Sequence, residues 1–389
     1  MRSSEPIPSD AMTPRAHCLV PRFLSMAALV ALATVPGAEA GAAEGLSPNQ
    51  TARIDSAVTA VIDRQHLPGL SIAIVAEGEL RWQKAYGLAD VENSVPARTT
   101  TVYRIASVSK PLTAVAAMQL AERGKLDLDA PVQKYVPAFP TKAQPITTRQ
   151  LLGHLSGVRH YKPDEEERTT RYGTLTAALE VFKDDPLEHE PGARFTYSTF
   201  GYTLIGAVIE GASGATYPEY MREHVFGPAG MTHTRVDDVA AIVPNRARGY
   251  SPKVYGRFDG EWRNAALMDP SYKTPGGGLL STAEDLARFA MALQNGALLA
   301  PASFRQMTTI QRARDGTETG YGLGWYVGKW EGRQAGTAVW HGGVQAGFTS
   351  ELRLLPEHRF AVVILTNLEG GGKLGLDALA DEIADIVLQ

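Results

Sequence analysis

β-strand patterns stand at both ends of the main part of the chain, and helical patterns fill its middle. Near the start, residues 70–76 and 80–86 are β-prone runs separated by Glu77-Gly78-Glu79, which predicts a hairpin. Four further β-type runs follow near the end: residues 326–330, 337–341, 349–355 and 360–367. Strands this far apart in the chain predict one antiparallel sheet that the C-terminal half completes.

Helical patterns predict what covers this sheet. Ser47-Pro48 is a helix-start signal before an amphipathic run, and residues 374–388 form a closing helix. Because 389 residues exceed the usual size of one simple domain, we expect either two domains or one domain with a large insertion. The predicted class is therefore α+β, with an α/β part at about 44–124 and 300–389 and a mostly helical insertion at about 125–299.

The first 43 residues have the pattern of a secretory signal peptide. Arg15 and Arg22 precede an apolar stretch, Phe23 to Val35, and small residues predict cleavage near Ala40 to Ala43. We expect a secreted or periplasmic protein. The only cysteine, Cys18, lies in the segment expected to be removed, so thiol nucleophiles, disulfides and thiolate metal sites are excluded for the mature chain.

Composition narrows the classes of partner. Charged residues make up 21% of the chain and the formal net charge is −4, with no basic run, which disfavours nucleic acid. No stretch of the mature chain is long and apolar enough to predict stable membrane insertion. The nine histidines include no His-Glu-x-x-His pattern, so we expect no metal and no organic cofactor.

The stretch "RIASVSKPLT" at 104–113 carries the first chemical signal, because Ser107 precedes Lys110 by three positions at a predicted helix start. Residues three apart share a helix face, so the lysine can lie beside the serine. A serine hydroxyl attacks only when a base takes its proton, and lysine is a base only when burial or a nearby cation keeps it neutral. The competing serine, Ser109, is expected to cap the helix. Alone, the motif favours a capping serine and a solvated lysine.

Two more signals lie far away in the chain. Tyr197 stands in a short turn before a helix, where a tyrosine can pass a proton to a leaving group when a nearby cation lowers its pKa. His341-Gly342-Gly343 ends a strand pattern, and glycines there let a strand approach a substrate, with a backbone N–H near Val344 as an oxyanion donor. Taken singly, both fit ordinary structural roles.

Together these motifs resemble the serine penicillin-recognising superfamily, which includes class C β-lactamases, D-alanyl-D-alanine carboxypeptidases and related esterases. The resemblance runs from about Leu67 to Leu388 and is closer still to the mitochondrial serine β-lactamase-like protein and its bacterial relatives. Besides 104–113, the stretches that carry it include "TTRQLLGHLSGVRHY", "PGARFTYSTFGYTLIG" and "SYKTPGGGLLST".

The resemblance implies the β-lactamase-like fold and a set of roles. Ser107 would be the acylated nucleophile, Lys110 its base and Tyr197 the proton relay. His341, Gly342 and Gly343 would lie beside the substrate, and the N–H groups of Ser107 and Val344 would form the oxyanion hole. His154 would be architectural. Self-association into a homo-oligomer is a secondary expectation, because the mitochondrial relative polymerises.

The sequence departs from the β-lactamase pattern at two substrate-binding positions. Thr199 stands where asparagine is usual, and His341 stands where lysine is usual. The threonine hydroxyl can make fewer hydrogen bonds to the acylamide group of a β-lactam than an asparagine amide can. A mostly neutral histidine attracts the β-lactam carboxylate less strongly than a lysine does. We therefore expect a serine hydrolase that acts on peptide amides or carboxylic esters, with a small peptide, ester or cell-wall-derived substrate.

The deacylating base and three alternative functions stay open. Neither Glu190 nor Glu210 can be placed at the acyl bond, so deacylation would fall to water activated by Tyr197 or Lys110. The alternatives are a β-lactamase or D-alanyl-D-alanine carboxypeptidase, a non-catalytic or self-assembling scaffold, and a covalent sensor that acylates without turnover.

Overall fold

The computed structural model describes residues 45–255, 257–332 and 335–389. Residues Ala43–Gln389 form one compact unit. The predicted signal peptide and its cleavage near Ala40 to Ala43 lie outside the described residues and stay predictions. Within the described residues, no helix combines the length and the apolar character needed to cross a bilayer.

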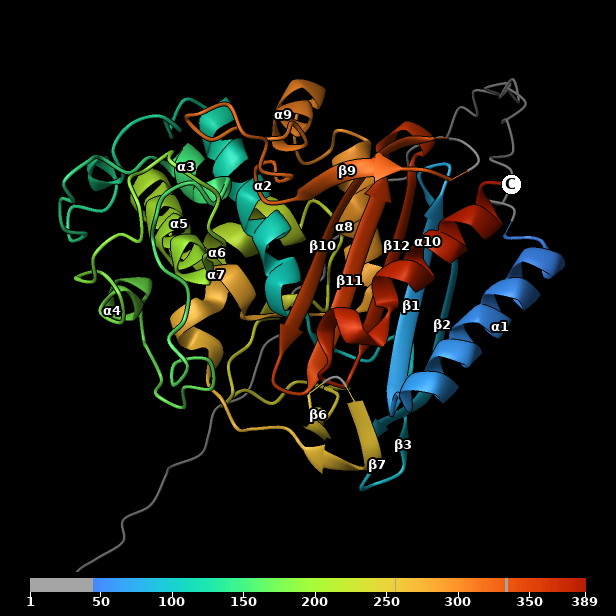
Figure 1. The fold of residues 1–389 in the computed structure, drawn as a ribbon. Helices are drawn as coiled ribbons and strands as arrows, with labels where there is room; N and C mark the ends of the chain where they lie inside the picture. Colours follow the sequence, from blue (N-terminus) through green and yellow to red (C-terminus); the bar gives the residue numbers. More distant parts are fainter. Residues whose placement is uncertain (1–44, 256, 333–334) are drawn as a thin grey trace, which may run out of the picture. The chain divides into compact units, whose positions relative to one another are not determined.

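A seven-stranded antiparallel sheet forms the centre of the unit (Figure 1). The inner pair joins the two ends of the chain, with Leu70 opposite Thr366 and Val75 opposite Ala361. This confirms the predicted sheet. Its strands, in spatial order, are β3 (Val95–Pro96), β2 (Glu79–Asp90), β1 (Gly69–Ala76), β12 (Phe360–Thr366), β11 (Phe348–Leu355), β10 (Gly336–Gln345) and β9 (Tyr326–Trp330).

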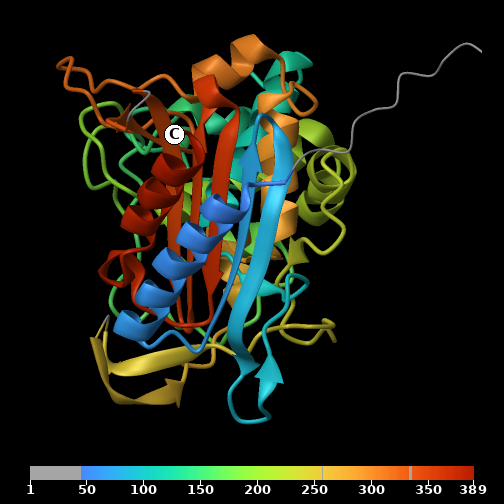
Figure 2. The same ribbon diagram turned by 90° about the vertical axis from the view of Figure 1, so that its right-hand side faces the viewer.

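The terminal helices cover one face of this sheet (Figure 2). α1 (Pro48–Gln65) begins with a capping box in which the Ser47 side chain accepts from the Gln50 N–H, as its start signal predicts. α1 packs against α10 (Leu376–Val387), and α10 packs against β11 and β12. Alternate β1 residues face opposite ways, so Ile72 and Ile74 join this helix layer while Ala73 and Val75 join the core beyond the sheet.

The other side holds the helical region, built around α2 (Ser109–Glu122). Every α2 residue from Ser109 to Leu120 is buried, as expected for a helix that other elements surround on all sides. Gly124 follows with φ of +66°, which confirms the predicted left-handed helix stop. The other helices here are α3 (Thr148–Leu152), α4 (Leu175–Leu179), α5 (Thr199–Ser213), α6 (Tyr217–Met221), α7 (Thr274–Gly277) and α9 (Pro301–Met307).

The range 125–299 is not a purely helical insertion: one of its predicted helices packs on the main sheet, and it contains strands that the pattern did not predict. α8 (Ala283–Gln294) lies in this range but packs against β1 and β12 of the main sheet. β8 (Leu279–Ser281) pairs with β4 (Tyr103–Arg104) and with β5 (Arg235–Val236) in a small second sheet. A separate hairpin is formed by β6 (Tyr250–Val254) and β7 (Arg257–Asn264).

Candidate active site

Ser107 lies on a strained turn between β4 and α2. The chain leaves β4, forms one 3₁₀ turn at Ala106–Val108 and then enters α2. Ala106 has φ of +45°, a left-handed conformation that costs a non-glycine residue free energy and often marks functional sites. Ser107 is partly exposed between buried neighbours, so its hydroxyl is accessible. Neighbouring Ser109 is the first residue of α2 and accepts from the Leu279 N–H at 3.3 Å, so the expectation that it caps the helix was wrong.

Lys110 is fully buried and its amine faces Ser107. The Lys110 Nζ lies 3.0 Å from Ser107 Oγ and 3.1 Å from Thr199 Oγ1. It donates to the Gly276 carbonyl oxygen at 2.7 Å. A neutral amine has two N–H donors and one lone pair, so donation to Gly276 and Thr199 leaves the lone pair for the Ser107 hydroxyl.

Burial lowers the pKa of Lys110 well below its ordinary value, and the nearby charge of Lys273 lowers it further. A desolvated ammonium beside a second cation is disfavoured on both counts. Lys110 therefore fits the base that the Ser107 position requires. Lys273 was missed by the sequence reasoning, although it lies in the quoted stretch at 271–282, because a single lysine before Thr-Pro has the pattern of a solvated side chain.

Tyr197 lies beside both groups. Its ring centroid is 4.7 Å from the Lys110 Nζ. Burial raises the pKa of the Tyr197 phenol above its ordinary value, and a hydrogen bond with Ser107 opposes that rise only in part. The expected cation that would lower this pKa is not realised, because the nearby Lys110 amine is neutral. Tyr197 is therefore a phenol that can donate a proton, and not a phenolate.

Two histidines hold the turn that carries Tyr197. The Ser198 N–H donates to His154 Nδ1 at 3.1 Å, and the Thr199 N–H donates to His160 Nδ1 at 3.3 Å. Both imidazoles must be unprotonated at these nitrogens, in keeping with pKa values that burial lowers, to about 4 for His160. The structure thus gives His154 a positioning role. Thr199, predicted to contact substrate, is itself buried, with its hydroxyl against Lys110.

His341 is buried on β10 and both ring nitrogens have partners. Nδ1 lies 2.6 Å from the Gly342 carbonyl oxygen, so Nδ1 carries the proton. Nε2 lies 3.1 Å from the Tyr321 hydroxyl and can accept from it. Burial lowers the pKa of His341 to about 3, so this side chain contributes no positive charge at neutral pH.

The glycines after His341 bring β10 against the nucleophile turn. A Cβ atom built on Gly343 would lie 2.5 Å from the Ile105 carbonyl oxygen and 2.9 Å from the Ser107 nitrogen. Only a residue without a side chain allows this approach. A cleft of about 400 Å³ follows the same strand, lined among others by Tyr197, Gly342 and Val344.

The cleft follows a strand edge that is free to pair. β9 pairs with β10 only from Gly336 to Trp340. Within the described part of the chain, no strand pairs with that edge of residues 341–345. Unpaired backbone groups at such an edge can bind an extended peptide.

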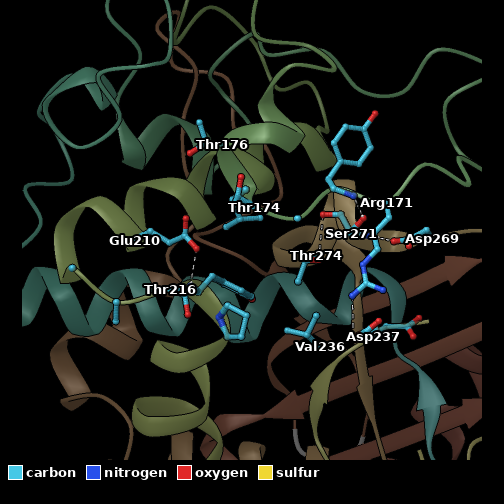
Figure 3. A pocket seen from close by; sticks show the side chains of 18 residues that line it. Arg171, Thr174, Thr176, Glu210, Thr216, Val236, Asp237, Asp269, Ser271 and Thr274 are labelled. Carbon is cyan, nitrogen blue, oxygen red and sulfur yellow. Dashed lines mark hydrogen bonds and ion pairs between the residues drawn. The ribbon is translucent and has the colours of Figure 1, made fainter. Parts of the chain in front are cut away.

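A larger cavity of about 810 Å³ lies elsewhere, between the 171–176 segment, the end of α5 and the 269–274 segment (Figure 3). Glu210 projects into it and accepts from the Tyr217 N–H at 2.8 Å. Among the described residues that line it, none is Ser107, Lys110 or Tyr197. Glu190 is exposed and pairs with Arg314 at 2.9 Å. Neither glutamate is thus among the groups that contact Ser107 or Lys110.

Metal-ligating side chains do not gather anywhere in the described ranges. Across residues 45–255, 257–332 and 335–389, no group of three or more His, Cys, Asp or Glu side chains is placed to hold a metal ion. The residues brought together around Ser107 are instead a lysine, a phenol and hydroxyl groups, which is the side-chain chemistry of covalent acyl transfer.

Known proteins resemble this chain along most of its length. Serine beta-lactamase-like protein LACTB, mitochondrial, from Homo sapiens is 36% identical over 303 residues, covering 60% of this chain and 54% of the relative. The chain thus spans about half the length of that relative. Protein flp from Staphylococcus aureus (strain MW2) is 28% identical over 336 residues, covering 83% of this chain and 64% of the relative.

Solved structures show the same fold. D-amino acid amidase from Ochrobactrum anthropi SV3 has a TM-score of 0.76 and 25% identity, covering 87% of this chain and 99% of the amidase. The octameric penicillin-binding protein homologue from Pyrococcus abyssi has a TM-score of 0.73 and 26% identity, covering 87% of this chain and 77% of the homologue. The Beta-lactamase family matches residues 54–385. With its antiparallel sheet, inserted helices and serine–lysine pair, the chain belongs to the Beta-lactamase family.

Proposed function

We propose that this protein is an exported serine hydrolase that forms an acyl-enzyme at Ser107 and acts on peptide amides or carboxylic esters. The observation that carries the proposal is the fully buried Lys110 amine, 3.0 Å from Ser107 Oγ and held by the Gly276 carbonyl. The similarity to a D-amino acid amidase supports an amide substrate.

In the proposed reaction, the Lys110 lone pair takes the Ser107 proton as Oγ attacks the substrate carbonyl carbon. The N–H groups of Ser107 and Val344 donate to the resulting oxyanion. The intermediate collapses when the carbon–leaving-group bond breaks. The proton held by Lys110 then passes through Tyr197 to the leaving nitrogen or oxygen. Water repeats the sequence on the ester, which frees the acid and restores Ser107.

The groups around the cleft favour amides and esters over β-lactams. His341 is neutral and turned into the protein, so it offers no cation to a β-lactam carboxylate. The Thr199 hydroxyl is committed to Lys110 and cannot also supply the contacts of an amide. One missing charge-assisted hydrogen bond costs about 1.5–3 kcal/mol.

A substrate panel tests this proposal. We expect kcat/KM for an amino acid amide or a short p-nitrophenyl ester to exceed that for a chromogenic cephalosporin by about tenfold or more, the equivalent of one lost charged contact. Ser107→Ala protein serves as the blank. Fastest turnover of the cephalosporin would reverse the assignment in favour of a β-lactamase, and a burst without steady turnover would identify a covalent sensor.

Gly343→Ala should disturb the site through backbone position alone. The new Cβ would lie 2.4 Å from Ser350 Oγ and 2.5 Å from the Ile105 carbonyl oxygen, so β10 must move away from the nucleophile turn. We expect kcat/KM to fall about 100-fold, because displacements of this kind misalign reacting groups, and the free energy of unfolding to fall by about 1–3 kcal/mol. Initial rates and thermal melts measure both.

Gly342→Ala is the matched control, because its Cβ would lie 3.2 Å from the end of the Glu351 side chain and 3.8 Å from the Ser350 carbonyl oxygen, an ordinary contact distance. This variant should lose less activity and less stability than Gly343→Ala. Equal losses in the two variants would contradict the close approach as the cause.

Self-association is a second proposed property. The similarity to an octameric homologue supports it, and light scattering at several concentrations, with wild type and Ser107→Ala compared, measures it separately from catalysis.

A further inference from the structure

A second lysine is buried near Lys110, and the proposed reaction gives it no role. Lys273 is only 3% exposed and ends the 3₁₀ turn Pro270–Lys273 before α7. Its Nζ lies 5.4 Å from the ring centroids of Tyr161 and Tyr272. Aromatic faces stabilise a cation that has lost much of its water. The position is thus built to keep a charged ammonium inside the protein.

The two lysines touch the same short segment. A Cβ atom built on Gly277 would lie 3.7 Å from Lys273 Cδ and 3.8 Å from the Ala106 carbonyl carbon. The preceding residue, Gly276, accepts the hydrogen bond from the Lys110 Nζ. The Lys273 stem is therefore packed one residue away from the carbonyl that holds Lys110, beside the nucleophile turn.

A second route joins the two lysines from the other side. Thr199 contacts the Lys110 Nζ through its hydroxyl and also hydrogen-bonds to Tyr161. The Tyr161 ring in turn faces the Lys273 ammonium. Thr199 and Tyr161 therefore connect Lys110 and Lys273 through packed side chains. Little water lies between the two lysines to screen the charge of the Lys273 ammonium.

The other titratable side chains near Lys110 are neutral, so the charge that acts on the Lys110 amine is that of Lys273. Burial lowers the pKa values of His154, His160 and His341, and it raises those of Tyr197 and Tyr202, so all five are neutral near pH 7.

Charged groups also face Lys273. Glu166, Glu167 and Asp237 raise its pKa, and Arg104 lowers it, but burial dominates and brings it to about 8. Asp237 is already paired with Arg104 at 2.7 Å. Lys273 is therefore mostly protonated at neutral pH, while the deeper Lys110 is not.

We propose that Lys273 is a positioning residue for acyl transfer: its ammonium, fixed behind the segment 276–277, keeps Lys110 as the free amine that faces Ser107. This inference rests on the proposed function. The positive charge that acts on Lys110 then comes from Lys273, and not from β10, where His341 stands.

The pH dependence of acylation tests this inference. In Lys273→Met, Lys110 should hold its proton to higher pH, so the acid limb of kcat/KM should move up by about one pH unit or more, the size of effect expected from one neighbouring charge. Lys273→Arg should restore the wild-type limb, and the exposed Lys125→Met should leave it unchanged. Lys273→Gln provides a second neutral variant if methionine prevents folding.

A direct measurement separates this inference from the proposed function. In Ser107→Ala protein with ¹⁵N-labelled lysine side chains, NMR follows the Lys110 signal through a pH titration, with Lys110→Met to assign it. Adding Lys273→Met should raise the titration midpoint of that signal even if Ser107 proves not to be the nucleophile. An unchanged midpoint, or an unmoved acid limb in both neutral variants, would overturn the role of Lys273.

Discussion

Ser107→Ala is expected to abolish covalent labelling by a fluorophosphonate and to reduce kcat/KM for the best ester or amide by about 10⁴-fold or more. The variant loses the hydroxyl that lies 3.0 Å from the Lys110 Nζ. The Thr199 hydroxyl, which also contacts this amine, is buried. Intact mass measures the adduct, and peptide mapping locates it within 104–113.

Ser109→Ala is the matched control for this experiment. Ser109 is buried two positions away, and its hydroxyl only accepts from the Leu279 N–H. We expect this variant to label as wild type does, with a loss of about 1 kcal/mol in the free energy of unfolding. An adduct on any residue other than Ser107, or turnover that survives Ser107→Ala, would sink the acyl-enzyme assignment.

Lys110→Met should give the second-largest loss. It preserves the buried apolar stem but removes the amine that receives the Ser107 proton, so the rate of acylation should fall by about 10³-fold. Stopped-flow labelling or initial rates with an activated ester measure this. The wild-type rate should be highest at pH values above the lowered pKa of Lys110 and should decline as the pH falls through it.

Lys110→Met should lower activity without lowering the stability of the folded protein. The folded protein keeps Lys110 neutral while the unfolded chain protonates it, so the unfolded state binds more protons and folding grows more favourable as the pH rises toward the ordinary lysine pKa. Lys110→Met removes this cost, so its melting temperature near pH 7 should equal or exceed that of wild type. A variant that folds well but keeps normal acylation would show that Lys110 is not the base.

The strands and long helices could be predicted because their patterns are local. The run 326–330 coincides with β9, and the predicted helix start at Ser47-Pro48 coincides with that of α1. The β6–β7 hairpin could not be predicted in this way, since Arg257–Asn264 is mostly polar and carries no alternating apolar face. α8 has an ordinary amphipathic pattern, which cannot tell whether its partner is a sheet or another helix.

In the candidate site, too, local contacts could be predicted from the sequence and long-range contacts could not. Ser107 and Lys110 are three residues apart, so their contact follows from local geometry. Lys273 is joined to them only by folding, and its charge depends on burial against two tyrosine rings. The sequence also could not show that His341 turns inward, with both ring nitrogens bonded.

By itself, the sequence determined the order of the long helices and of the longer main-sheet strands, and the spacing of the serine and the lysine, because backbone preference and side-chain periodicity act over a few residues. Only the tertiary structure decided that the Lys110 amine is neutral, that the Lys273 amine is charged and that the Ser107 hydroxyl is accessible. Those properties depend on desolvation and on charges brought close from distant segments, and neither exists until the chain has packed.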